Sequence, residues 1–262
     1  MRSDSLDFIC CPGCKGILTY PFLSAKSEIS SAFFCKDCNI KYSINDGYLD
    51  FLGDKEILYR SKWDKTIRSL YAKFYSTLTN FILLFIGGPK NARNEVLNLL
   101  ELSDDAVILE TGMGPGDNFP FLLAKVKNFR IFGIDNQKQM MIRCMDNLRK
   151  WKIDAELYRA DAEELPFRNE MFDVVLHIGA FNVFANKDKA LNEMIRVAKP
   201  GARIVIADES EKGYKFFNMF TGNKDAFVLP FDLVPKTMLN ITTGYIWKGF
   251  GFVIAFTKPL SY

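Results

Sequence analysis

After residue 104 the sequence alternates between short apolar runs, typical of buried strands, and amphipathic runs, typical of helices. This alternation predicts right-handed crossovers and a mostly parallel sheet covered by helices on both faces. Two aromatic, β-rich runs that meet near Lys248-Gly249 predict a terminal hairpin with one antiparallel strand. We therefore expect a doubly wound α/β domain with a seven-stranded sheet. The strands are predicted at 106–111, 130–135, 155–160, 172–179 and 202–208 and in the hairpin over 242–259, and the helices at 119–126, 137–151 and 187–198.

The cysteines are concentrated at the start of the chain, where five of the six lie within the first 38 residues. Cys11 with Cys14 and Cys35 with Cys38 form two Cys-x-x-Cys pairs about 20 residues apart, a zinc-site spacing. Four thiolates fill the shell of a tetrahedral Zn(II), so a structural site is favoured over a catalytic one. We predict a zinc ribbon over residues 1–53, with a disulfide pair or a redox site as alternatives; Cys10 is left over.

Composition and charge place few limits on the function. The formal net charge of +3 over 262 residues does not by itself argue for a nucleic-acid partner. The longest apolar run starts at Phe81 and is far shorter than the roughly 20 residues that span a bilayer, so no transmembrane segment is expected. The first residues lack the apolar core of a secretory signal. The expected location is therefore cytoplasmic.

Residues 54–102 have a helical pattern and lead into the rest of a domain predicted over 54–262. One helix is expected over 56–86, ending at Gly87-Gly88-Pro89, and a second over 91–102. The first carries aromatic and apolar residues at three- and four-residue spacing. This stripe could pack into the core, or the segment could form a lid over an active site.

Three glycines at alternate positions, Gly112, Gly114 and Gly116, follow the first strand of this domain. A loop without side chains at the carboxyl end of a parallel strand allows close approach to a ligand. A carboxylate beside the glycines would repel the pyrophosphate of a dinucleotide, yet Glu110 precedes them and Asp117 follows. A ligand that carries an ammonium and a sulfonium, S-adenosylmethionine (SAM), fits these charges better than NAD.

Two further carboxylates support a nucleoside ligand. Asp135 ends the second strand, about 20 residues beyond the glycines, where it can accept the ribose hydroxyls. Asp161 ends the third strand, where it could accept the adenine amino group while the backbone N–H of Ala162 meets a ring nitrogen. Asp117 could instead cap the helix that carries Pro120.

Four motifs in order resemble those of class I SAM-dependent methyltransferases, which are Rossmann-like: "ILETGMGPGDN", "FGIDNQKQMM", "DAEELPFRNEMFDVVL" and "ALNEMIRVAKPGARIVIAD". The resemblance covers about 105–208, with departures at Thr111, Ala198 and Ala202. It implies SAM as cofactor and methyl transfer as the activity. The cofactor-binding residues it implies are Glu110, Thr111, Gly112, Met113, Gly114, Gly116, Asp117, Asp135, Asn136, Asp161, Ala162 and His177.

The end of the fourth strand, across the crevice from the glycines, is where an acceptor is expected. His177, the only histidine of the chain, falls there, with Asn182 close behind. His177 could act as a general base near neutral pH, or it could line the cofactor pocket. Asn182 has a similar status, and both are catalytic candidates.

The two halves of the chain point to different acceptors. The ribbon resembles the zinc domains that accompany tRNA and rRNA methyltransferases, whereas the first helix and the ending "GFGFVIAFTKP" resemble quinone and lipid methyltransferases. Because Phe and Tyr crowd both flanks of the catalytic core, we expect a small, largely apolar acceptor. An RNA acceptor bound through the ribbon is the alternative, and a non-catalytic SAM-binding subunit is a third.

Overall fold

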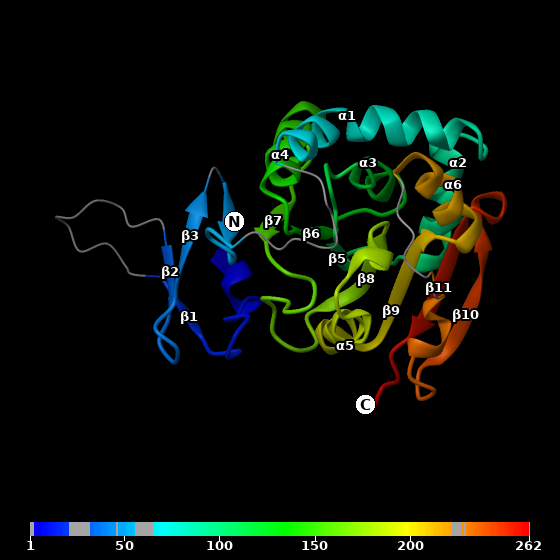
Figure 1. Cartoon of the computed structure of the whole chain (residues 1–262). Coiled ribbons are helices and arrows are strands. Elements are labelled where there is room, and N and C mark those ends of the chain that lie inside the picture. The colour runs from blue at the N-terminus through cyan, green and yellow to red at the C-terminus, as the bar shows by residue number, and fades with distance from the viewer. Residues whose placement is uncertain are drawn as a thin grey trace.

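A computed structural model describes residues 3–20, 32–45, 47–55, 65–221, 227 and 229–261. The predicted alternation of strands and helices is confirmed, and it builds a sheet with helices on both faces (Figure 1). Five strands are parallel neighbours in the order β7-β6-β5-β8-β9. Their bounds are β5 (Val107–Thr111), β6 (Arg130–Asp135), β7 (Glu156–Arg159), β8 (Phe172–Ile178) and β9 (Ala198–Glu209).

The predicted terminal hairpin is present at one edge of the sheet. β10 (Leu239–Ile246) and β11 (Gly251–Thr257) are joined by a 3-10 turn, η5 (Trp247–Gly249), at the predicted turn position. β11 lies antiparallel beside β9, so it is the antiparallel strand of the domain.

At the other edge the structure corrects the predicted strand number, because the described sheet has eleven strands rather than seven. The N-terminal region contributes β1 (Leu18–Thr19), β2 (Ala32–Cys35), β3 (Lys41–Asn45) and β4 (Tyr48–Asp50). β4 pairs in parallel with β7, with Leu49 opposite Tyr158. The sequence pattern missed this pairing because a strand of three residues has no periodicity to detect. The result is that β7 is not an open sheet edge, which would otherwise present unpaired backbone groups.

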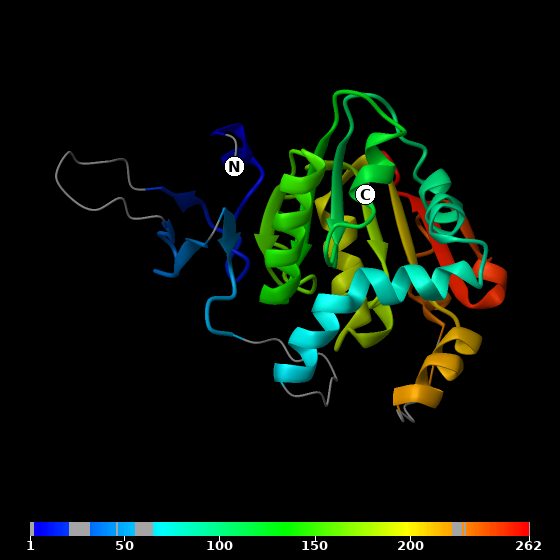
Figure 2. The ribbon, with the colours of Figure 1, turned by 90° about the horizontal axis from the view of Figure 1, so that it is seen from above.

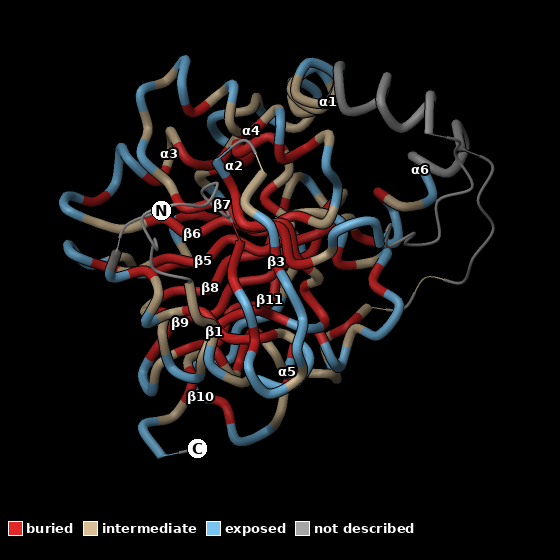
Figure 3. The backbone as a smooth tube through the Cα atoms, turned by 90° about the vertical axis from the view of Figure 1, so that its left-hand side faces the viewer, coloured by how far each residue is buried: buried red, intermediate tan, exposed pale blue. Residues whose placement is uncertain are grey.

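The helices cover the two faces as the residue alternation along the strands requires. On β5, Ile108 packs on one face with α2 (Pro89–Leu97), α3 (Phe119–Leu123) and α4 (Lys138–Trp151). Leu109 packs on the other face with α5 (Lys187–Val197) and with residues next to η1 (Ser3–Asp7). The strands between these layers are almost entirely buried (Figure 3). The remaining elements are η2 (Asn98–Leu100), η3 (Phe181–Val183), η4 (Pro230–Leu233) and α6 (Glu211–Thr221).

The first helix of the lead-in, α1 (Lys65–Leu84), lies across α4 and α2 at the top of the molecule in Figure 1. Figure 2 shows the same helix from above, running past the sheet along one side. Its predicted first residues, 56–64, lie outside the described residues. Among the described helices, none is both long enough and apolar enough to pass through a bilayer.

The N-terminal region is attached along the β7 side of the sheet. The backbone N–H of Cys10 donates to the Pro166 carbonyl at 3.0 Å, and Ile9 forms a bridge with Phe167. Ile9, Phe33 and Leu49 belong to the same buried cluster as the α5 face of the sheet. The N-terminal region therefore shares a core with the rest of the chain; the predicted boundary at residue 53 stays a prediction.

Candidate functional site

The glycine loop begins where β5 ends, and its three glycines have left-handed backbone angles, with φ of 64° at Gly112, 54° at Gly114 and 77° at Gly116. A side chain is strained at such angles, so the backbone itself favours glycine here. A Cβ at Gly112 would also lie 3.0 Å from His177 Cε1, and one at Gly116 would lie 2.8 Å from Cys144 Sγ. At two of the three glycines, the protein's own side chains thus leave no room for a Cβ atom. Close approach to a ligand is not the only reason for them.

Asp135, at the end of β6, joins the second strand to this loop. Its Oδ2 accepts the backbone N–H of Gly114 at 2.9 Å, and its Oδ1 accepts that of Gln137 at 2.8 Å. The carboxyl is 9% exposed, and this burial raises its pKa to about 6. A carboxylate has about four lone-pair positions, so this group can also accept from a ligand.

Of the two carboxylates that flank the glycines, Glu110 is buried and Asp117 is partly buried. Glu110 is completely buried, its Oε1 accepts from Asn118 Nδ2 at 2.7 Å, and burial raises its pKa to about 8. Asp117 accepts from Ser76 Oγ at 3.1 Å and lies 3.6 Å from the guanidinium of Arg93. Burial raises the pKa of Asp117, and the charge of Arg93 opposes that shift.

The alternative role of Asp117 as a helix cap does not hold, because the residue at the N-cap of α3 is Asn118. The side chain of Asp117 is instead bound by α1 and α2, through Ser76 and Arg93. Met113, predicted beside the cofactor, has its side chain inside the core, where a Cβ at Gly133 would overlap its sulfur. Its backbone N–H donates to the Ile134 carbonyl at 3.0 Å.

The adenine-side residues follow β6 and β7. Asp161 Oδ1 accepts the backbone N–H of Glu163 at 2.9 Å, and Ala162 is buried beside it. The carbonyl of Asn136 accepts from Arg159 Nε at 3.1 Å. These contacts fix the loops after both strands at the same edge of the sheet as the glycines.

His177, at the end of β8, is completely buried, and burial lowers its pKa to about 4. Its Nδ1 lies 3.0 Å from Thr111 Oγ1, and that hydroxyl can donate to the Leu176 carbonyl at 3.4 Å. The Thr111 hydroxyl therefore bonds Nδ1, whereas Nε2 has no hydrogen-bond partner within the described part of the chain. The rings of Phe181 and Phe184 pack on the imidazole, with centroids at 5.7 and 5.0 Å. His177 is therefore neutral at physiological pH.

Asn182 lies on the far side of β8. Its backbone N–H donates to Asp208 Oδ2 at 2.7 Å, and its Nδ2 donates to the Glu209 carbonyl at 3.0 Å. Burial raises the pKa of Asp208 to about 6 and that of Glu209 to about 8. Sequence reasoning missed this pair, although both acids stand at the carboxyl end of a predicted strand and could have been found by that rule. It also missed Ser76 and Arg93, which no local pattern connects to the glycine loop.

The arrangement fits a polar ligand at the glycine loop. Among the described residues, few buried side-chain polar atoms lack a hydrogen-bond partner, and four of them surround this loop: Glu110 Oε2, Asp117 Oδ2, Asn136 Nδ2 and His177 Nε2. Buried polar atoms are normally paired, so their concentration at one place indicates a binding site. Two of the four atoms belong to carboxyl groups, which suits a ligand that brings a positive charge.

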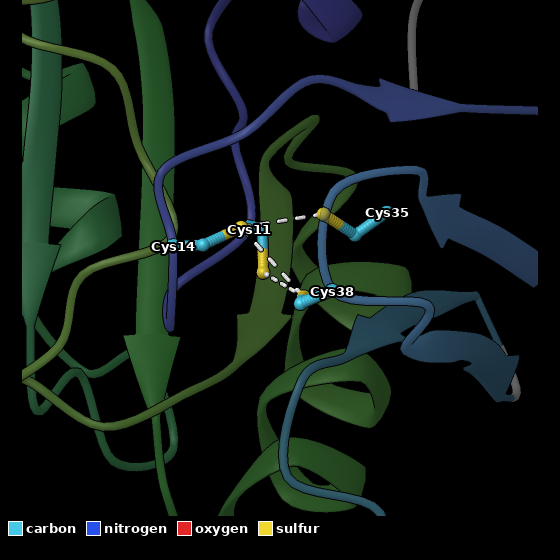
Figure 4. A group of neighbouring side chains, drawn as sticks. All are labelled: Cys11, Cys14, Cys35 and Cys38. Carbon is cyan, nitrogen blue, oxygen red and sulfur yellow. Dashed lines mark hydrogen bonds between the residues drawn. The ribbon is translucent and has the colours of Figure 1, made fainter.

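The four predicted metal ligands are brought together between the two cysteine turns of the N-terminal region (Figure 4). The sulfur atoms of Cys11, Cys14, Cys35 and Cys38 all lie within 4.8 Å of one another, and the shortest pair, Cys14 and Cys35, is 3.4 Å apart. Four sulfurs at Zn–S distances of about 2.3 Å would be about 3.8 Å apart, so the set fits zinc. Cys10 is buried away from this cluster.

The two Cys-x-x-Cys turns have the same backbone arrangement. The N–H of Lys15 donates to the Cys11 carbonyl at 2.8 Å, and that of Asn39 donates to the Cys35 carbonyl at 3.0 Å. The hydroxyl of Tyr42 lies 3.0 Å from Cys11 Sγ.

Comparisons with known proteins agree with this geometry. Residues 108–201 match the family described as a methyltransferase domain. The phosphatidylethanolamine N-methyltransferase of Cereibacter sphaeroides is 30% identical over 103 residues, 38% of this chain and 49% of that protein. The ubiquinone/menaquinone biosynthesis C-methyltransferase UbiE of Wigglesworthia glossinidia brevipalpis is 27% identical over 191 residues, 71% of this chain and 73% of that protein. The chain thus spans about half the length of the first relative and about three quarters of the second.

A solved structure with the same fold is the complex between the Haloferax volcanii Trm112 methyltransferase activator and a methyltransferase. It aligns with a TM-score of 0.60 at 15% identity, over 76% of this chain and 100% of that chain. At this identity the likeness shows the fold alone. The family match identifies the segment from β5 to β9 as a methyltransferase domain, and the solved structure shares its fold. Its relatives include quinone and phospholipid methyltransferases.

Proposed function

We propose that the protein transfers a methyl group from SAM to a small, largely apolar acceptor of the quinone or lipid type. The observation that carries the SAM part is the joined pair of Asp135 and the glycine loop, surrounded by buried polar atoms without partners. SAM, when bound, supplies an electrophilic methyl group. The chain's own residues then have to bind, orient and exclude water, which suffices for an in-line displacement.

In this proposal each part of the site holds one part of the cofactor. The free lone pairs of Asp135 accept the ribose hydroxyls, and Asp161 with the N–H of Ala162 binds the adenine. Glu110 and Asp117 lie where the positively charged end belongs. A nearby positive charge favours the ionised form of a carboxyl, so cofactor binding would lower the raised pKa of Glu110.

The acceptor is inferred from the surroundings of β8 and from the relatives. The imidazole of His177 is packed by Phe181 and Phe184, so its immediate surroundings are aromatic. Two relatives are named as quinone and phospholipid methyltransferases. His177 Nε2 has no hydrogen-bond partner within the described part of the chain, and the catalytic roles of His177 and Asn182 stay proposals.

The same proposal includes a structural zinc ion bound by the four cysteines and a cytoplasmic location. It does not include an RNA acceptor. A groove beside the first cysteine turn offers a place to look for RNA, but its lining is of mixed sign. It contains three cations, Lys15, Lys189 and Arg196, and four acids, Glu163, Glu164, Asp188 and Glu193. A phosphate backbone prefers an uninterrupted positive surface.

The test is to incubate the purified protein with methyl-labelled SAM and a total cell extract, and then to separate solvent-extractable, RNA and protein fractions. We expect label in the solvent-extractable fraction, and none with Asp135→Ala. Label in RNA would replace the proposed acceptor with the RNA alternative. SAM binding by calorimetry without label in any fraction would favour the non-catalytic subunit.

A further inference from the structure

The helix α1 has its polar and apolar faces reversed relative to an ordinary surface helix, in which the apolar stripe faces the core. Its inner face is polar where it meets the glycine loop. Ser76 donates to Asp117 at 3.1 Å, Asn80 accepts from Arg93 at 3.1 Å, and Tyr75 lies 3.9 Å from the position of a Cβ at Gly114. The side of α1 that touches the glycine loop is therefore held by hydrogen bonds.

The outer face of α1 is apolar. Phe74, Leu78 and Phe81 are 53%, 47% and 58% exposed, and Leu84 and Phe85 are 61% and 70% exposed. The spacings of four, three, three and one place these residues in one stripe. The core-packing interpretation of the aromatic pattern is therefore wrong for these five residues. These side chains keep about half or more of their surface exposed to solvent, and α1 lies at the outer boundary of the molecule in Figures 1 and 2.

The stripe continues onto a basic surface at the end of α1. Lys248 Nζ donates to the Phe85 carbonyl at 3.4 Å, and Lys212 Nζ donates to the Lys248 carbonyl at 3.4 Å. Lys212 also lies 4.2 Å from the ring centroid of Phe250, against which the exposed Phe216 packs. Lys90, in the first turn of α2, is exposed close behind Phe85.

Acidic groups do not cancel this charge. Glu211 pairs with Lys215 at 2.6 Å, and Glu95 accepts the backbone N–H of Trp247 at 3.2 Å. Among the described residues, Lys90, Lys212 and Lys248 lie around the end of the stripe, and Lys215 is paired with Glu211. A row of large apolar side chains with a cationic border is the composition of helices that lie in the interface of a bilayer with anionic lipids.

We propose that the outer face of α1, with its lysine border, docks on the surface of an anionic lipid bilayer. The helix would lie flat, since it has 20 residues and its inner face is committed to the glycine loop. A helix is about 10 Å across, so docking would hold the loop about that far from the lipid. This inference rests on the proposed function, because it supplies the route by which an apolar acceptor would reach the site without crossing water.

The test is co-sedimentation of the full-length, zinc-loaded protein with phosphatidylcholine vesicles, with and without about one third phosphatidylglycerol. We expect binding to the anionic vesicles, weakened about tenfold or more by the double variant Phe81→Ser with Phe85→Ser. The matched control is Leu260→Ser, because Leu260 is 81% exposed near the C-terminus and away from α1. Equal binding of the double variant and the wild type would overturn the proposal.

The charge requirement has its own variants. Lys212→Glu should weaken binding to the anionic vesicles about fivefold or more and leave the weak binding to neutral ones unchanged. Lys127→Glu is the control, since Lys127 is exposed in the turn before β6, at the edge of the sheet away from the glycine loop. No difference between these two variants would contradict the lysine border.

Two further measurements separate this inference from its alternatives. Light scattering that shows a dimer, which Phe81→Ser with Phe85→Ser converts to a monomer, would assign the stripe to a second copy of the chain. SAM binding by calorimetry on the same preparations tests the proposed function independently. If the wild type binds SAM but not vesicles, only the docking proposal is overturned. If the wild type does not bind SAM, the proposed function is overturned as well.

Discussion

The cysteine ribbon and the glycine loop both gather negative charge in a small volume, and they accommodate it in different ways. In the ribbon four thiol groups lie within 4.8 Å of one another, which suits a bound cation. At the loop Glu110 and Asp135 are buried and Asp117 is partly buried, and burial raises the pKa of each. The three acidic side chains of the loop are therefore partly protonated and hydrogen-bonded while no cationic ligand is bound.

The difference also appears in which residues occupy the left-handed turns. In the ribbon Lys15 and Asn39, with φ of 59° and 62°, are exposed, so their side chains have room. In the loop the corresponding angles belong to glycines, because His177 and Cys144 pack against two of them. The same left-handed backbone angles thus accept a side chain where solvent surrounds the residue, and require glycine where other side chains pack against the backbone.

The largest expected effect is loss of the metal ion. Cys35→Ser should abolish stoichiometric zinc and remove metal-linked folding free energy on the order of 10 kcal/mol, because the ribbon is too small to fold on its own core. Zinc content by mass spectrometry and thermal unfolding measure this. Cys10→Ala is the control, since Cys10 is buried outside the cluster and should leave one zinc per chain. If the Cys35→Ser protein contained no zinc and were as stable as the wild type, the cysteine cluster of the ribbon would need no bound cation.

The next effect tests the connection between the two regions. Arg159 forms a buried ion pair with Asp50 at 3.0 Å and also holds the Asn136 carbonyl. Arg159→Met leaves the Asp50 carboxylate buried without its partner, so it should cost about 3–5 kcal/mol of unfolding free energy in urea. It should also weaken SAM binding. The double variant with Asp50→Leu should recover part of the stability.

The control for this connection is the exposed pair of Arg149 and Asp146, at 3.1 Å, for which Arg149→Met should cost about 1 kcal/mol or less. Equal losses for Arg159→Met and Arg149→Met would mean that the ribbon and the loop are joined by their apolar core alone.

A smaller effect should show how the loop carries its charge. Because burial raises the pKa of Glu110 to about 8, the folded protein binds this proton more tightly than the unfolded chain does. Stability therefore falls as pH rises from the unfolded pKa, about 4.3, to about 8. Glu110→Gln removes this dependence, so it should stabilise the SAM-free protein by about 1–3 kcal/mol near pH 9 and much less near pH 5.

Urea unfolding of both proteins at the two pH values measures the difference, with exposed Glu211→Gln as the control. SAM affinity should fall in Glu110→Gln, because the carboxylate is unavailable to the cation. If Glu110→Gln and the wild type were equally stable near pH 9, Glu110 would be ionised in the folded protein. The loop would then hold a full negative charge, as the thiolates of the ribbon do.

The sequence predicted the features of both regions that depend on local patterns. Residues 130–135 form β6 as expected, and the four cysteines meet, because strand periodicity and Cys-x-x-Cys turns are encoded by neighbours in the chain. The features it missed depend on contacts between distant segments. β4 joins β7 across more than a hundred residues, and Ser76 reaches Asp117 from α1. The roles of the individual cofactor residues stay predictions.

The smallest expected effect compares one substitution in both regions. Thr111→Val removes the partner of His177 Nδ1 at the buried end of β5, whereas Thr19→Val removes an exposed hydrogen bond to the Phe34 carbonyl in the ribbon. We expect Thr111→Val to cost about 1–2 kcal/mol, since a buried ring nitrogen left unpaired has lost its solvation, and Thr19→Val to cost less than about 0.5 kcal/mol. Urea unfolding near pH 7 measures both. Since the pKa of His177 is lowered to about 4, its neutral form stabilises the fold above about pH 6.5, and this stability is lost as pH falls toward 4. Equal costs for the two substitutions would mean that the imidazole finds another partner and that the loop is as tolerant as the ribbon.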